Sequence, residues 1–124
     1  MAAPNIVNVT TITGKSAAVD LTTTAATAVV SNAAASGKVF KINSLVVSNV
    51  DGTNAADITV SYYSAAAIGG TATQIVSTVS VPADASLIVI DKNTSLYLEE
   101  DRSIGATAGA ANDLKIVVSY EEIS

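Results

Sequence analysis

The sequence predicts an all-β protein, folded as a single antiparallel β-sandwich with jelly-roll-like connections and about eight to nine strands. Two observations support this fold class. Apolar and polar residues alternate with a period of two along most of the 124 residues, as they do in strands that bury one face. Turn-forming residues interrupt the alternation roughly every ten residues, which is typical of sandwiches and barrels.

The first predicted strands lie in a segment with few charges. Apolar side chains alternate with Asn and Thr over residues 5–13, a pattern suited to strand pairing. Gly14 separates this strand from a second one at 17–22. Because the segment is apolar and nearly uncharged, we expect part of it to be ordered against the sandwich or against a neighbouring subunit.

The next stretch, residues 22–35, is rich in alanine but is not predicted to be helical. It has a high density of Thr and Val and no 3.6-residue apolar period. It is therefore assigned to loop, with a strand at 27–32. A turn at Ser36 and Gly37 then leads into a long strand at 38–50.

The remaining strands follow the same alternation. Ile58, Val60 and Tyr62 alternate with polar neighbours, and Leu114 to Tyr120 does the same near the C-terminus. Pro82 should stop one strand and open a turn, because it has a fixed φ and no N–H. The glycines in 103–113 indicate a flexible loop. The predicted strands of this part are 58–63, 73–81, 86–91, 94–99 and 114–121, separated by turns at 51–54, 69–70, 82–84, 91–93 and 108–113.

The composition removes most enzymatic chemistry and points to an assembled protein. There is no cysteine and no histidine, so thiolate chemistry and the commonest metal ligand are absent. Charged residues make up 14 % of the chain, against roughly 25 % in ordinary domains. A surface of small, uncharged side chains is suited to lying flat against another protein. The net charge of −5 disfavours nucleic acid as a partner, and no segment resembles a signal peptide or a membrane span.

Three acidic residues, Glu99, Glu100 and Asp101, are adjacent at the end of a predicted strand. Adjacent residues on a strand point to opposite faces, so Glu99 and Glu100 cannot act as an acid and base pair. Glu99 and Asp101 could share a face and bind Ca²⁺ with Asp57, Asp84 or Asp113, but no EF-hand spacing supports this. We interpret the cluster as a solvated strand end compensated by Arg102. No catalytic, cofactor-binding or metal-binding residue is predicted, and no cofactor.

The tyrosines divide between core and surface. Tyr62 and Tyr120 are in register with core-facing Ile and Val, whereas Tyr63 and Tyr97 alternate to the opposite faces of their strands. Together with the apolar residues of the N-terminal segment, the outward tyrosines form the candidate interaction surface. Its members are Ile6, Val7, Val9, Ile12, Tyr63 and Tyr97.

The second half of the chain resembles a known class of protein. The stretches "KVFKINSLVVSNVDGTNAADITVSYY", "VSVPADASLIVIDKNTSLYLEEDRSIGATAG" and "LKIVVSYEEIS" are similar to small β-rich virion structural proteins of tailed bacteriophages, particularly those that infect marine cyanobacteria. The likeness covers residues 38–124. It implies a virion component that assembles with capsid or tail proteins and catalyses nothing.

These observations lead to one functional interpretation and two alternatives. The chain is expected to be one domain, with residues 1–37 as N-terminal strands or arm and 38–124 as sandwich core. The favoured function is a capsid cement or decoration protein of the virion that forms a homo-oligomer, with a trimer as one candidate, and stabilises the particle. The alternatives are a neck, tail or fibre accessory protein, and a carbohydrate-binding module that uses Tyr63 and Tyr97. An enzyme is disfavoured.

Overall fold

The computed structural model describes residues 4–124. Within them the chain forms nine strands and one short 3-10 turn. The strands are β1 (Ile12–Asp20), β2 (Thr27–Asn32), β3 (Val39–Asn49), β4 (Ala56–Ala65), β5 (Gly69–Val81), β6 (Ser86–Ile90), β7 (Leu96–Leu98), β8 (Arg102–Ala108) and β9 (Leu114–Ile123), and the 3-10 turn is η1 (Lys92–Thr94).

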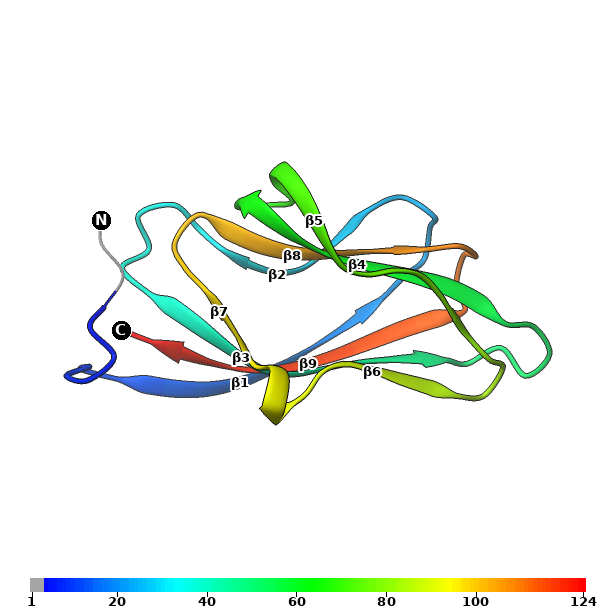
Figure 1. Ribbon diagram of the computed structural model, residues 1–124, viewed down its shortest axis with the longest axis horizontal. Helices are drawn as coiled ribbons and strands as arrows, with labels where there is room; N and C mark the ends of the chain where they lie inside the picture. Colours follow the sequence, from blue (N-terminus) through cyan, green and yellow to red (C-terminus); the bar gives the residue numbers. More distant parts are fainter. Residues whose placement is uncertain (1–3) are drawn as a thin grey trace.

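The strands form two antiparallel sheets that pack face to face (Figure 1). Sheet A has the order β1-β9-β3-β6, with β7 also paired to β3, and sheet B has the order β2-β8-β4-β5. The chain thus pairs like one long folded hairpin, β1 with β9, β2 with β8, β3 with β6 and β4 with β5, and these pairs alternate between the sheets. This is jelly-roll topology, so the predicted fold class is confirmed.

The core lies between the sheets and consists of aliphatic side chains. Ile42, Leu45 and Val47 of β3 face Ile58 and Val60 of β4, and all five are fully buried. The alternation along β3 changes phase at a bulge between Ile42 and Ser44, which keeps the later apolar residues directed inward. As predicted from the alternation, Tyr62 and Tyr120 pack against this core, and the Tyr120 ring lies 5.3 Å from that of Phe40.

The N-terminal segment differs from the two predicted strands. Residues 5–11 form no strand, and a single strand, β1, runs through Gly14. The reason is its partner: β9 pairs with β1 over nine consecutive residues, from Ile12↔Ile123 to Asp20↔Lys115. A glycine weakens a strand but does not end it where a long partner supplies every ladder bond. β1 is an edge strand of sheet A, and β2 is an edge strand of sheet B.

Residues 103–108 are also different from the prediction. The expected flexible loop is β8, an inner strand of sheet B that pairs with both β2 and β4. Gly105 is buried there because its neighbours leave no space for a side chain. A Cβ at this position would lie 2.6 Å from Cγ2 of Ile68 and 2.9 Å from Cε1 of Tyr63. The glycine thus marks a close packing contact rather than flexibility.

The turn after β5 is as predicted. β5 ends at Val81, and Pro82 opens the turn to β6, in which the Ala85 N–H donates to the Pro82 carbonyl at 3.1 Å. Asp84 has a left-handed φ of 56° in this turn, a conformation that Asp tolerates better than most residues. The proline therefore separates a strand of sheet B from a strand of sheet A.

Candidate functional site

An apolar groove lies at one end of the sandwich, between the segment that precedes β1 and residues of β3 and β7 in sheet A. Pro4, Ile6, Val39, Tyr97 and Glu99 line it, and its volume is about 230 Å³. Val39 lies on β3, and the register of β3 and β7 puts Lys41 directly opposite Tyr97. Val39 is buried, with 4 % of its surface exposed, whereas Tyr97 is 44 % exposed. The groove therefore has an apolar floor, an aromatic wall and one carboxylate at its rim.

Hydrogen bonds to the C-terminal residue fix the segment that carries Ile6. The backbone N–H groups of Thr10 and Thr11 both donate to the Ser124 carbonyl, at 2.7 and 3.0 Å, and the Ser124 N–H donates back to Thr11. A turn precedes these bonds, in which the Val7 N–H donates to the Oδ1 of Asn5. The segment before β1 is thereby held against the end of β9.

The structure brings some of the six predicted surface residues together and separates others. Ile6 and Tyr97 line the same groove. Val7 is 91 % exposed and Val9 is half-buried. Ile12, 58 % exposed, lies opposite Ile123, which in turn lies opposite the groove residue Val39.

Tyr63 lies apart from the other five residues. It belongs to β4 of sheet B and is half-buried beside Gly105. Alternation directs Tyr63 and Tyr97 to the outer sides of opposite sheets, because their neighbours Tyr62 and Leu98 face the core. The two rings cannot stack on one sugar, so the geometry does not support the carbohydrate-binding alternative.

A second candidate site is the β5 edge of sheet B, whose other edge strand is β2. β5 has 13 residues and contains no charged residue and no proline. Most of it is exposed, including Ile75 at 38 %. The pairing of β5 with β4 shifts register at three places, so the strand is irregular as well as long. The absence of charge over residues 69–81 was visible in the sequence, but the edge position was not.

The acidic cluster of residues 99–101 anchors a hairpin instead of forming a site. Asp101 has a left-handed φ of 57°, and its Oδ1 accepts the N–H of Ala66 at 3.0 Å. The guanidinium of Arg102 donates to the carbonyls of Ser64 and Asp101, at 3.0 and 2.8 Å. Arg102 therefore binds backbone oxygens here, beyond the charge compensation that the sequence suggested. Among residues 4–124, no three acidic side chains lie close enough to hold a metal ion.

Two serines that the sequence did not single out hold the same hairpin over sheet B. Ser103 Oγ accepts the Ile68 N–H at 2.9 Å and donates to the Ala65 carbonyl, and Ser31 Oγ accepts the Ala67 N–H at 2.9 Å. The tip between β4 and β5 has left-handed φ angles at Ala67 and Ile68. These contacts hold the tip against β8, where the Ile68 side chain covers Gly105.

A three-residue ion cluster closes the sandwich near the chain ends. Glu122 accepts from Lys15 at 3.0 Å and from Lys38 at 3.1 Å, and its side chain is only 14 % exposed. Burial raises the pKa of Glu122, but the hydrogen bonds and charges of the two lysines lower it by more, so the net pKa lies below its ordinary value. The hydrogen bond and charge of Glu122 raise the pKa of Lys15. The cluster joins β1, β9 and the entry to β3.

Comparison with known proteins places the fold but not a family. No protein-family model matches the chain, and no curated protein sequence does. A solved structure from Bacillus endospore appendages, described as a novel family of disulfide-linked pili, superposes with a TM-score of 0.54. The superposition covers 92 % of this chain and 88 % of that chain at 17 % sequence identity. This likeness is one of fold.

No helix within residues 4–124 is long and apolar enough to span a membrane.

Proposed function

We propose that this protein is a non-enzymatic structural subunit that assembles with copies of itself and with other proteins. The observation that carries the proposal is the edge of sheet B, where β5 presents 13 uncharged residues. Soluble monomers usually protect such edges with charges, proline or a covering segment, because unpaired N–H and C=O groups pair with any available strand. An edge of this kind is stable in solution when a partner strand covers it.

The composition supports the same conclusion. Only 14 % of the residues are charged, and the chain has a net charge of −5. A lone domain normally carries more charge on its surface for solubility. Strand addition at β5 would supply main-chain hydrogen bonds without requiring charged side chains. β1, one of the two edge strands of sheet A, carries Lys15 and Asp20 and is better protected than β5.

The shared fold with an appendage subunit is consistent with a structural role. The solved structure belongs to disulfide-linked pili. The present chain contains no cysteine, so its copies would be joined by non-covalent contacts. Strand pairing and the packing of apolar faces would therefore stabilise the assembly.

The finer assignment is a virion protein of the capsid cement or decoration type. Residues 38–124 carry the resemblance to bacteriophage virion proteins, and an uncharged jelly roll fits a role in binding and stabilising a particle. A neck, tail or fibre position is the alternative within the virion. A filament subunit outside a virion is the second candidate, which the likeness to a pilus protein favours.

The first experiment tests the β5 edge. The purified chain should sediment as an oligomer, with a mass above that of the 12.4 kDa monomer. Gln74→Lys puts a charge on the exposed part of β5 and should lower the average mass of the sedimenting oligomer. Thr24→Lys, in the exposed loop before β2, makes the same charge change away from the edge and should have no effect. A wild-type chain that stays monomeric and binds no particle would contradict the proposal.

Electron microscopy and particle binding then separate the finer assignments. A decoration protein binds particles that lack it and raises their resistance to heat, whereas a filament subunit polymerises alone. We also propose the groove beside Tyr97 as an attachment point for an apolar side chain of the partner. Ile6→Asp should weaken particle binding more than Val7→Asp, because Ile6 lines the groove and the more exposed Val7 does not.

A further inference from the structure

The outer face of sheet A has an exposed apolar row across its middle. Here the outer face means the outward side chains of β1, β9, β3 and β6. Ala18, Val117, Val46 and Ile88 lie directly opposite one another from strand to strand. Ile88 is 64 % exposed and Val117 is 54 % exposed. Four aligned apolar side chains form one continuous patch, which differs from single apolar residues scattered over a surface.

Serines flank the row on both sides, together with one ion pair on one side, and leave the row accessible. On one side lie Ser16, Ser119 and Ser44, which are opposite one another in the register. On the other side, four residues lie opposite one another from strand to strand, in the order Asp20, Lys115, Ser48 and Ser86. Serine side chains extend little from the sheet, so the apolar row is accessible to another flat surface.

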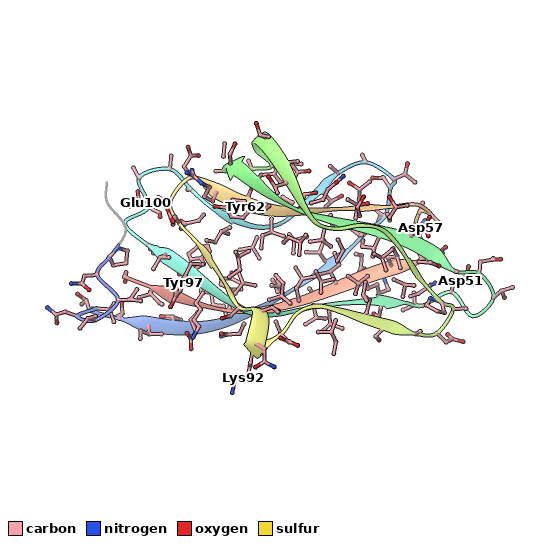
Figure 2. The ribbon with its side chains drawn as sticks, viewed as in Figure 1. Asp51, Asp57, Tyr62, Lys92, Tyr97 and Glu100 are labelled. Carbon is pink, nitrogen blue, oxygen red and sulfur yellow. The ribbon has the colours of Figure 1, made fainter. Side chains whose placement is uncertain are left out.

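The outer face is neutral although the chain is strongly acidic. Its ionisable residues are two acids and two bases, Asp20, Lys115, Lys41 and Glu121. Lys115 binds Asp20 at 3.1 Å, and Lys41 lies directly opposite Glu121. The residues that give the chain its excess negative charge lie outside this face. Asp51 and Asp57, for example, lie at the end of the sandwich opposite to the chain termini (Figure 2). Glu99 stands at the rim of the face, beside the N-terminal segment.

From this arrangement we propose that a second copy of the chain packs face to face on the outer side of sheet A. Two chains of charge −5 repel each other, and this face lets them approach without bringing a net charge together. The four strands have 9, 10, 11 and 5 residues, and at ~3.4 Å per residue and ~4.8 Å between strands they give a face of roughly 570 Å². This is about 70 % of the ~800 Å² that each partner contributes to a stable interface of standard size.

A two-fold axis explains why one face serves both partners. In an isologous contact the same patch meets itself, so the apolar row of one copy lies across the row of the other. The turn η1 stands out beyond sheet A between β6 and β7, and Lys92 points away from the sandwich (Figure 2). η1 follows the edge strand β6, so it would lie at the margin of the contact, where the second copy packs beside it. This contact uses sheet A and is separate from strand addition at β5 in sheet B.

The test uses a chain whose β5 contact is already weakened, so that failure of one proposal does not conceal the other. In a Gln74→Lys background, sedimentation velocity should still detect a dimer. Val117→Lys should raise its dissociation constant by about a hundredfold, because two like charges would face each other in a desolvated contact. Val50→Lys is the matched control, since Val50 is 49 % exposed but lies outside the face. Equal effects of the two substitutions would overturn the proposal.

A cross-linking measurement covers the case in which Val117→Lys is poorly folded. The chain has no cysteine, so a cysteine introduced at position 117 is the only target of a bismaleimide reagent. Packed sheets lie ~10 Å apart, which suits a short reagent better than a direct disulfide. Val117→Cys should give a cross-linked dimer at protein concentrations at which Val50→Cys does not. Equal cross-linking of both variants, or none at Val117, would contradict the face-to-face dimer.

Discussion

Asn32 and Asn49 close opposite ends of the sandwich in the same way, each by joining one sheet to the other. Asn32, the last residue of β2, donates to the carbonyls of Lys38 and Leu98 at 2.9 and 3.0 Å. Asn49, the last residue of β3, donates to the carbonyls of Asn54 and Val81, both at 2.9 Å. Both side chains are buried, and each also accepts a hydrogen bond at its Oδ1, from Ser36 and from the Asp51 N–H respectively.

The two asparagines should be far more important for stability than an exposed asparagine. Asn32→Ala or Asn49→Ala leaves two carbonyls without their donor, at a cost of about 3 kcal/mol in the free energy of unfolding. Asn93→Ala, in the exposed turn η1, is the control and should change stability by less than about 0.5 kcal/mol. Urea unfolding of the three variants measures the difference. Similar midpoints for all three would contradict the role of the buried pair.

Glu122 should make the protein sensitive to acid. Its pKa is lowered in the folded state, so its contribution to stability is fully present above its ordinary pKa of 4.5 and is lost as the pH falls through the lower folded value. Glu122→Gln should therefore destabilise the protein at pH 7 and have less effect at pH 3. Unfolding midpoints at the two pH values, with Glu121→Gln as control, test this. A loss that is equal at both pH values would exclude the ion cluster as its cause.

Asp101 should act through its side-chain oxygen and not through its charge. Asp101→Asn keeps an acceptor for the Ala66 N–H and tolerates the left-handed φ, so the double variant with Glu99→Gln should stay within about 0.5 kcal/mol of wild type. Asp101→Ala loses the acceptor and should release the tip between β4 and β5. Amide hydrogen exchange at residues 65–68 reports this release. Unchanged exchange in Asp101→Ala would show that the serines hold the tip alone.

Gly105 should not tolerate even alanine. The added Cβ meets Cγ2 of Ile68, Cε1 of Tyr63 and the Thr27 carbonyl within 3.3 Å, so the hairpin tip has to move. We expect a loss of about 1–3 kcal/mol, as for other overpacked sites. Gly14→Ala is the matched control, because nothing lies within 4 Å of its added Cβ. Thermal unfolding compares the two, and equal stability would mean that the tip adjusts at no cost.

The sequence by itself determined the local features of the fold. Period-two alternation identified the strands around Ile58 and Leu114 and assigned Tyr62 and Tyr120 to the core, because side-chain direction in a strand depends only on the parity of the position. Pro82 ended its strand as predicted, since a missing N–H acts within a few residues. The all-β sandwich class followed from the same local pattern together with the spacing of the turns. The count of about eight to nine strands agrees with the structure only because the strand β8, expected as a loop, offsets the two predicted N-terminal strands that form the single strand β1.

Only the tertiary structure decided which strands are neighbours and which are edges. Gly14 lies inside a strand because β9, about a hundred residues further along the chain, supplies a continuous partner. Gly105 lies in an inner strand because β8 pairs with both β2 and β4, and the hairpin tip between β4 and β5 leaves no room for a side chain there. The separation of Tyr63 from Tyr97 and the open edge of β5 have the same origin. Alternation is a property of one strand, whereas edges, faces and covered glycines depend on pairing between segments that are remote in sequence, which no local pattern encodes.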